Sequence, residues 1–470
     1  MVRTRIAPSP TGDPHIGTIF QALINYAFAR KNKGQFLVRI EDTDQTRQVK
    51  GAEKAIFQAL DWFGLQPDEK PYRQSDRLQI YQKHANQLVD KNKAYYCFCS
   101  SDRLTKIRQE MQKAGQPPMY DGKCRDLDPQ LAAKKAKTQP HVIRMKIITD
   151  QKIIKVHDEI RGNIEFDPAV IDDQVILKSD GFPTYHLAVV VDDHLMKITH
   201  TVRGEEWISS APKHVLLYQY FDWQPPKFIH TPLLRNPDKS KLSKRHGHAS
   251  VSWYQKQGYL PEAILNFLAT RVWNHPQGLE VFDINQLIKH FDFKDMHVQG
   301  PIVDLDKLNW LNGQWIRKLD DKELLKRLEK FTPKQLPKEL LVKILPLIKE
   351  RLETLSQIKD LTSYFIQDPT LDKKDILKES KVDSQATADY LEKVKTTLNN
   401  LKSWTVKDIE DSLHQLQQKL NWKPRPAFMT IRLAVTGCSV TPPLFDVLHI
   451  LEKSTVISRL THAQEALKKN

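Results

Sequence analysis

The chain has 470 residues, of which 40% are hydrophobic, so it is long enough to form several domains with buried cores. Its 72 Lys and Arg residues exceed its 57 Asp and Glu residues by 15, which favours a polyanionic partner without identifying one. No apolar run approaches the ~20 residues of a membrane-spanning helix, and the N-terminus has no signal-peptide pattern, so we expect a cytoplasmic protein without a membrane partner.

The chain opens with a predicted strand, a turn rich in Pro and Gly, and a predicted helix. Residues alternate in polarity from Val2 to Ile6, and apolar residues recur at helical spacing from about His15 to Arg30. A helix N-terminus beyond a strand end favours phosphate, because its free N–H groups and dipole attract anions. His15 can add a donor, and Gly17 lacks the Cβ that would block a base or ribose. A His that merely packs would fit the same pattern.

Two motifs on either side of the predicted nucleotide-binding domain favour the functional interpretation. Arg5-Ile-Ala-Pro-Ser-Pro-Thr-Gly12 with His15-Ile-Gly-Thr18 resembles the HIGH signature of class I aminoacyl-tRNA synthetases, in the form of the glutamyl/glutaminyl branch. Lys241-Leu-Ser-Lys-Arg245 is similar to the KMSKS loop of the same family. The resemblance implies that His15, Gly17 and Lys244 bind ATP and that Lys241 belongs to the same catalytic set. Lys244 would neutralise phosphate charge as pyrophosphate leaves.

A second strand is predicted for Gln35–Ile40, and it ends at an acidic cluster that begins with Glu41. Acids at the carboxyl end of a parallel strand face the ligand crevice, although they could also cap the following helix. The family resemblance assigns Glu41 to the substrate ammonium group and Arg5 to a carboxylate, while Ala7 and Ser9 shape the pocket. This polarity suits an acidic amino acid.

Helical periodicity covers residues 51–65 and 75–91, and an inserted subdomain with three of the four Cys residues follows. Four Cys residues are too few for a disulfide framework, and the cluster favours a metal. Cys97, Cys99, Tyr120 and Cys124 resemble the zinc knuckle of glutamyl-queuosine tRNA(Asp) synthetases, so we expect a structural Zn²⁺. Asp126 is an alternative fourth ligand, and a zinc-free remnant with buried Cys side chains is the alternative to a metal site.

After strand-like runs at 141–148 and 152–156, we expect the chain to return to the sheet between Val175 and His194. This string resembles the glutamyl-tRNA synthetase pattern, as does Thr201-Val-Arg-Gly-Glu-Glu-Trp207. The resemblance places Tyr185 and Arg203 in the glutamate pocket, with Arg203 on the side-chain carboxylate. Some family members have Asn where this chain has Val189, so one hydrogen bond to the substrate is expected to be absent or supplied by water.

The rest of the chain is predicted to be helical, with repeated Lys residues on its exposed faces. The overall expectation is an α/β fold in which a Rossmann-like catalytic domain carries an inserted acceptor-binding subdomain and precedes an all-helical anticodon-binding region. The predicted parts are catalytic first half 1–93, insert 94–174, catalytic second half 175–248, stem-contact region 249–320 and anticodon-binding region 321–470.

The sequence is therefore identified as a member of the glutamyl-tRNA synthetase family. The resemblance implies ATP-dependent attachment of L-glutamate to tRNA(Glu) through a glutamyl-adenylate, with Mg²⁺ bridging the phosphates and Zn²⁺ as a structural ion. We expect a monomer. Two alternatives stay open: an enzyme that also charges tRNA(Gln), and a glutamyl-queuosine tRNA(Asp) synthetase, which lacks a long helical C-terminal part. A catalytically silent RNA-binding protein would explain the basic charge but not the two motifs.

Overall fold

The computed structural model describes residues 1–148, 152–242 and 247–468. It divides into two compact units, the first comprising Met1–Gln255 and Pro261–Leu305 and the second comprising Lys256–Leu260 and Asp306–Asn470. None of the helices within the described ranges is both long enough and apolar enough to cross a membrane.

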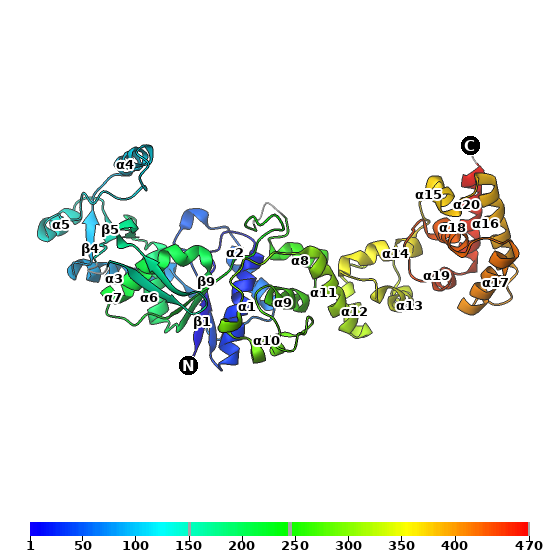
Figure 1. Ribbon diagram of the computed structural model, residues 1–470, viewed down its shortest axis with the longest axis horizontal. Helices are drawn as coiled ribbons and strands as arrows, with labels where there is room; N and C mark the ends of the chain where they lie inside the picture. Colours follow the sequence, from blue (N-terminus) through cyan, green and yellow to red (C-terminus); the bar gives the residue numbers. More distant parts are fainter. Residues whose placement is uncertain (149–151, 243–246, 469–470) are drawn as a thin grey trace. The chain divides into compact units, whose positions relative to one another are not determined.

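Two groups of parallel strands lie side by side at the centre of the first unit and together form what we call the central sheet (Figure 1). Its strands are β1 (Arg3–Ile6), β2 (Gln35–Ile40), β3 (Tyr72–Arg73), β9 (His200–Gly204) and β10 (Lys227–Thr231). The first three pair in the order β1-β2-β3, and β9 pairs with β10. Because Thr199 N–H donates to the Arg3 carbonyl at 3.0 Å, β1 also lies beside β9. The strand order therefore reverses between β1 and β9, and such a reversal leaves a crevice at the carboxyl ends of the strands.

Helices that follow the predicted apolar periodicity pack around this sheet. In α1, the predicted residues Ile16, Ile19, Phe20, Leu23 and Ala27 are all buried. The helices of the unit outside its insert are α1 (Ile16–Lys31), α2 (Ala52–Trp62), α3 (Leu78–Asp90), α6 (Tyr185–Leu195), α7 (Ala211–Tyr220), α8 (Val251–Gln257), α9 (Pro261–Thr270) and α10 (Ile284–His290).

The insert carries a small antiparallel sheet of its own and a hairpin that joins the central sheet (Figure 1). The small sheet has the order β4 (Ala94–Cys97), β5 (Val142–Met145), β8 (Val175–Leu177), and helices α4 (Ser101–Lys113) and α5 (Pro129–Ala136) lie between β4 and β5 in sequence. The hairpin consists of β6 (Ile154–Asp158) and β7 (Gly162–Phe166). Asp158 of β6 is in register with Phe228 of β10. Part of the sequence between residues 94 and 174 therefore extends the catalytic sheet.

The expected return to the catalytic sheet between Val175 and His194 is wrong, because the chain rejoins that sheet only at β9. Only Val175–Leu177 is a strand, and it pairs with β5, whereas Tyr185–Leu195 forms helix α6. The run Leu187–Val191 is apolar at every position and buried throughout. A short continuous apolar run does not distinguish a buried strand from a buried helix by its periodicity, so the sequence pattern could not decide between them.

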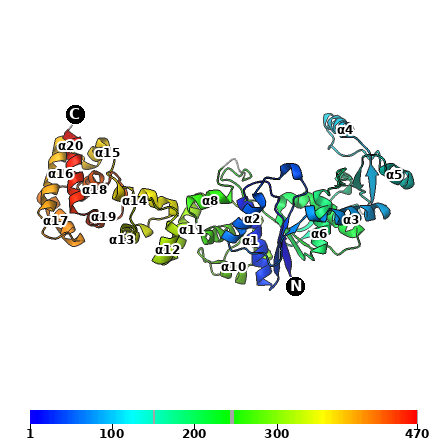
Figure 2. The ribbon, with the colours of Figure 1, turned by 180° about the vertical axis from the view of Figure 1, so that it is seen from behind.

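The second unit is helical, in agreement with the prediction. Helices α16, α18 and α20 lie together near the C-terminus (Figure 2), where they share a core with α19 that includes Leu391, Ile431, Leu448 and Leu460. Its helices are α11 (Leu305–Lys318), α12 (Asp321–Leu328), α13 (Lys338–Lys349), α14 (Ile358–Ile366), α15 (Lys373–Ser380), α16 (Ser384–Asn399), α17 (Val406–Lys419), α18 (Pro424–Thr436), α19 (Leu444–Leu451) and α20 (Lys453–Lys468).

A buried carboxylate on α6 ties the central strands together beneath the crevice. Asp193 accepts from Arg5 Nε and Nη2 at 3.0 and 2.8 Å and from Arg39 Nη1 at 2.6 Å. Thr201 Oγ1 donates to the same carboxylate at 3.0 Å. Burial alone would raise the pKa of Asp193, but the two guanidinium groups lower it to about 2. The carboxylate is therefore ionised at neutral pH and links α6 to β1, β2 and β9.

We expect Asp193→Asn to lower the free energy of unfolding by about 3–5 kcal/mol at pH 7, because two buried cations lose their counter-ion. Urea unfolding followed by circular dichroism measures the change. Asp222→Asn is the matched control, since Asp222 is 82% exposed where it pairs with Lys91, and exposed pairs contribute about 0–1 kcal/mol.

The same variant has a defined pH dependence. The folded pKa of Asp193 is depressed to about 2, so its contribution is complete above the unfolded value of about 4 and is lost as the pH falls towards the folded value. The stability difference between wild type and Asp193→Asn should shrink below about pH 4. A difference that stays constant down to about pH 2 would contradict the assigned role of the carboxylate.

Candidate active site

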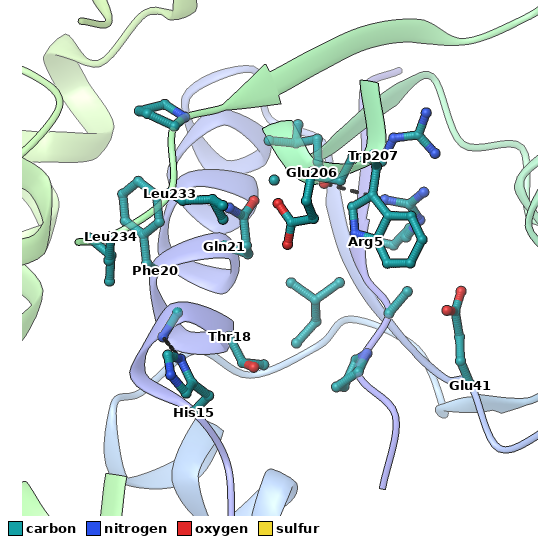
Figure 3. Close-up of a pocket in the computed structure, with 18 of the residues that line it drawn as sticks. Arg5, His15, Thr18, Phe20, Gln21, Glu41, Glu206, Trp207, Leu233 and Leu234 are labelled. Atoms are coloured by element: carbon teal, nitrogen blue, oxygen red, sulfur yellow. Dashed lines mark hydrogen bonds between the residues drawn. The ribbon is translucent and has the colours of Figure 1, made fainter. Parts of the chain in front are cut away.

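A cavity of about 270 Å³ lies at the crevice between β1, β9 and the N-terminus of α1 (Figure 3). Its lining includes these residues that the sequence singled out: Arg5, Ala7, His15, Gly17, Glu41, Tyr185, Arg203 and Lys241. Ser9 is exposed and does not belong to the lining. Lys244 lies outside the described residues. One cavity therefore brings together side chains from positions 5 to 241, at the place where an open α/β sheet binds ligands.

The N-terminus of α1 faces this cavity with a His cap. His15 has an extended backbone, and its Nδ1 accepts from the Gly17 N–H at 3.0 Å. A Cβ on Gly17 would lie 3.0 Å from the same Nδ1, so a side chain at this position would push the ring away. Gly17 thus lets the imidazole fold over the first turn, where the helix dipole favours an anion.

Backbone pairing places the segment after the second motif against the first. Ile16 N–H donates to the Ala249 carbonyl at 2.7 Å, and Val251 N–H donates to the Pro14 carbonyl at 2.9 Å. Lys241, before the gap in the described residues, is exposed and lines the cavity. Backbone hydrogen bonds therefore hold the segment after the gap against the start of α1, and Lys241, before the gap, lines the same cavity.

The charges of Arg5 and Glu41 are already partnered within the chain. Arg5 binds Asp193 through two nitrogens, and its Nη1 makes a long contact of 3.4 Å to the Val202 carbonyl. Glu41 pairs with Arg39 at 2.9 Å. Burial raises the pKa of Glu41 despite that pairing. Both side chains also line the cavity. Each therefore has an ion-pair partner within the chain and is accessible to a ligand.

Arg203, on β9, is buried, and its nitrogens have a different set of partners. Its Nε donates to His230 Nε2 at 3.0 Å, and its Nη1 lies 3.0 Å from both Tyr185 Oη and His214 Nδ1. Its Nη2 is buried and has no hydrogen-bond partner among the described residues. A buried unsatisfied donor costs about 1–3 kcal/mol, and in a site it marks the place where a ligand acceptor belongs.

Several lining residues were not singled out from the sequence as site residues. The Trp207 ring packs on Tyr185, with the ring centroids 4.2 Å apart, and Glu206 extends towards the space between α1 and Arg5 (Figure 3). Gln21 donates to Thr231 Oγ1 at 2.6 Å, while its Oε1 is buried and meets no hydrogen-bond donor in the described part of the chain. Gln21 follows Gly17 by one helical turn, so helical periodicity was the signal that could have revealed it. Val189, expected to leave a substrate hydrogen bond unmade, is a buried lining residue.

A second candidate site lies in the insert. The sulfurs of Cys97, Cys99 and Cys124 all lie within 4.8 Å of one another. Tyr120 Oη is 3.5 Å from the sulfurs of both Cys97 and Cys99. Asp126, the alternative ligand, is exposed and lies 3.9 Å from Lys146 Nζ. The donor set that converges is therefore three thiols and one phenol.

Known proteins match this chain over nearly its whole length. Residues 1–310 match the family described as tRNA synthetases class I (E and Q), catalytic domain, and residues 323–464 match the anticodon binding domain. The chain is 44% identical over 475 residues to the glutamate–tRNA ligase of a Marinomonas species, with 99% of this chain and 96% of that protein covered. The glutamate–tRNA ligase of Stutzerimonas stutzeri is 42% identical over 477 residues, with the same coverage.

A solved structure agrees with these matches. The crystal structure of a glutamate tRNA ligase from Elizabethkingia meningosepticum in complex with its amino acid superposes with a TM-score of 0.88 and 34% sequence identity. The match covers 99% of this chain and 100% of that chain.

We expect His15→Ala to lower the free energy of unfolding by about 0.5–2 kcal/mol, because the Gly17 N–H loses its cap. His15→Asn should restore most of that loss, since an Asn oxygen caps the same donor. Thermal unfolding of the two variants beside wild type measures the difference. Equal stability of the Ala and Asn variants would show that the contact between His15 and Gly17 does not stabilise α1.

Proposed function

Because this chain belongs to the class I tRNA synthetases of the glutamate and glutamine branch, we propose that it attaches L-glutamate to tRNA(Glu) in two steps. First, the α-carboxylate of glutamate attacks the α-phosphorus of ATP, which forms the glutamyl-adenylate and releases pyrophosphate. Then a hydroxyl of the terminal tRNA ribose attacks the activated carbonyl and releases AMP. The observation that carries the proposal for this cavity is the buried Arg203 with its unpaired Nη2.

In this proposal, the nucleotide half of the site consists of the start of α1 and the KMSKS-like motif Lys241–Arg245. The positive end of the α1 dipole and the His15 ring attract the phosphates, and Gly17 leaves room for the base or ribose. Lys241 and Lys244 balance the charge that develops as pyrophosphate leaves. Mg²⁺ that arrives with ATP supplies further charge neutralisation at the phosphates.

The amino-acid half of the site is formed by Arg203, Tyr185 and Glu41. Arg203 Nη2 donates to the side-chain carboxylate of glutamate, and Tyr185 borders the same position. Glu41 accepts from the substrate ammonium group, and Arg5, with Nη1 held only by a long contact, adds positive charge towards a carboxylate. Ala7 completes the lining in this proposal, and a role for Ser9, which lies outside the lining, stays a prediction from the sequence. Catalysis then rests on positioning and charge stabilisation rather than on covalent participation of the protein.

The helical second unit is proposed to read the tRNA. Residues 323–464 match an anticodon binding domain, and the excess of 15 positive charges suits a phosphate backbone. We retain the predicted division into catalytic, insert, stem-contact and anticodon-binding parts. Charging of tRNA(Gln) stays an open alternative, and a monomeric state and a cytoplasmic location stay predictions. The glutamyl-queuosine alternative is not favoured, because the similarity to glutamate–tRNA ligases spans the full chain.

The Cys cluster fits a structural Zn²⁺. Tetrahedral coordination with Zn–S bonds of about 2.3 Å places two sulfurs about 3.8 Å apart, and the Cys99 and Cys124 sulfurs are 3.6 Å apart. A phenolate ligand would lie about 3.5 Å from each sulfur by the same geometry, which is the distance of Tyr120 Oη from two of them. We propose Cys97, Cys99, Tyr120 and Cys124 as the ligands, with the ion holding the knuckle of the insert together.

We expect Arg203→Ala to raise the KM for glutamate by at least about thirtyfold, because the substrate loses a buried charged partner worth about 2–5 kcal/mol. The KM for ATP should change much less. Charging of tRNA(Glu), tRNA(Gln) and tRNA(Asp) with labelled glutamate gives both constants and the tRNA preference. Failure of the wild-type protein to charge tRNA(Glu) would contradict the proposed function. Equal effects of the variant on glutamate and ATP would show that Arg203 is structural.

The zinc proposal predicts about one Zn²⁺ per chain in protein purified without added metal, as determined by elemental analysis. Cys97→Ser should lose most of the metal because thiolates are the strong ligands, and Tyr120→Phe should weaken retention against a chelator. Cys438→Ser is the matched control, because Cys438 lies outside the cluster. Fully active wild-type protein without zinc would mean that the three Cys residues are a metal-free remnant.

A further inference from the structure

The acceptors that hold Arg203 are uncharged, unlike those of the neighbouring buried guanidinium groups. Arg5 and Arg39 both bind the Asp193 carboxylate. Arg203 is held instead by two imidazole rings and one phenol, each at 3.0 Å. Within the described part of the chain, Arg203 makes no ion pair with a carboxylate. Its hydrogen bonds are partly satisfied while its charge is not neutralised.

The ring of His230 can accept from Arg203 only if its proton lies on the other nitrogen, and Asp158 ensures this. Asp158 Oδ2 lies 2.7 Å from His230 Nδ1 and accepts from the His230 backbone N–H at 2.9 Å. Its Oδ1 accepts from the N–H groups of Ile160 and Arg161 at 3.0 Å. An ionised carboxylate only accepts hydrogen bonds, so Nδ1 must donate to it and Nε2 keeps its lone pair for Arg203.

The electrostatics of the buried groups agree with this tautomer. Although burial raises the pKa of Asp158, its hydrogen bonds from His230 and the backbone hold that pKa below the ordinary value. Burial lowers the pKa of His230. Burial and the Arg203 charge also lower the pKa of His214. An ionised Asp158 beside neutral rings is therefore the stable state at neutral pH.

We propose that His230, oriented by Asp158, is a positioning residue that makes the pocket select an anionic side chain. The inference rests on the proposed function, because it assigns the glutamate side-chain carboxylate to Arg203. His230 fixes the guanidinium plane through Nε without neutralising it, so both the free Nη2 donor and the unbalanced charge are left for the substrate. A neutral amide such as glutamine would leave that buried charge uncompensated, and sites of this kind reject such analogues strongly.

The structure offers a matched pair of variants that separates the two contacts of His230. In His230→Gln the side-chain amide reaches the position of Nε2, so it can still accept from Arg203 but loses the contact to Asp158. In His230→Asn the amide takes the position of Nδ1, so it keeps the donor to Asp158 but cannot reach Arg203. The two variants are similar in polarity and differ in which partner they retain.

The expected result is an asymmetry between these variants in glutamate-dependent charging of tRNA(Glu). His230→Asn should raise the KM for glutamate by about tenfold to a hundredfold, because a hydrogen bond to a charged group is lost, and should lower the preference for glutamate over glutamine. His230→Gln should stay within about threefold of wild type. The KM for ATP should change less than about twofold in both. Thermal unfolding of each variant identifies any loss of fold.

Three outcomes would overturn the inference. One is a His230→Asn enzyme with an unchanged KM for glutamate, another is His230→Gln as impaired as His230→Asn, and the third is a parallel rise in both constants. If His230→Asn does not fold, Tyr185→Phe tests the same set of acceptors by removing a single hydroxyl, and an unchanged KM for glutamate in that variant would also overturn it. Wild-type charging activity tests the proposed function separately, so its failure is distinguishable from failure of the variant pattern.

Discussion

The architecture of the first unit depends on one buried carboxylate. Asp193 binds Arg5 from β1 and Arg39 from β2, and it also accepts from Thr201 in β9. An ion removed from water costs several kcal/mol, and that cost is offset only when its lone pairs are well satisfied. Here two guanidinium groups and a hydroxyl satisfy them. A shift of β1 or β2 would therefore separate a buried guanidinium group from Asp193. This constraint fixes the strands that form the base of the crevice.

The same constraint determines what the crevice can recognise. Arg5 pairs with Asp193, and Arg39 pairs with both Asp193 and Glu41, whereas Arg203 has no carboxylate partner among the residues that the structure describes. Its neighbours take hydrogen bonds without supplying negative charge. A ligand with a carboxylate provides the missing counter-ion, while a neutral ligand of the same shape does not. The proposed selectivity for an anionic side chain rests on this contrast between buried cations that have a carboxylate partner and one that has none among the described residues.

Local sequence patterns predicted much of the fold. Strand β2 has the predicted bounds Gln35–Ile40, and α1 begins one residue after His15. Helix α1 carries a clear helical apolar period, and β2 is a short, mainly apolar run that follows Gly34 and ends before an acidic cluster. Helix α6 was missed because its apolar run has no period, and the hairpin Ile154–Phe166 gave no local sign that it would extend the central sheet. Pairing between distant strands depends on three-dimensional neighbours that a linear pattern does not contain.

For the site as well, local motifs were predictive, whereas contacts between residues far apart in the sequence were not. Motif resemblance placed His15, Arg5 and Arg203 in one cavity, and the structure brings them together. The partners of those residues could not be predicted, because Arg5 meets Asp193 across 188 positions and His230 meets Asp158 across 72. Spacing in the sequence carries no signal for contacts of that range. The motifs therefore predicted which residues lie in the cavity. Which of their charges are paired within the chain could be learned only from the three-dimensional structure.

The proposed nucleotide and amino-acid halves of the site differ in the contacts that hold them, so we expect them to tolerate substitutions differently. The nucleotide half rests on backbone groups at the start of α1 and on a segment paired to it through Ile16 and Val251. The amino-acid half rests on a chain of side chains from Asp158 through His230 to Arg203. Most substitutions leave backbone hydrogen bonds in place. A series of hydrogen-bonded side chains, by contrast, is interrupted when any one of its residues is replaced. Because Asp158 lies in the β6–β7 hairpin, we expect substitutions in that hairpin to affect binding at the amino-acid half more than binding at the nucleotide half.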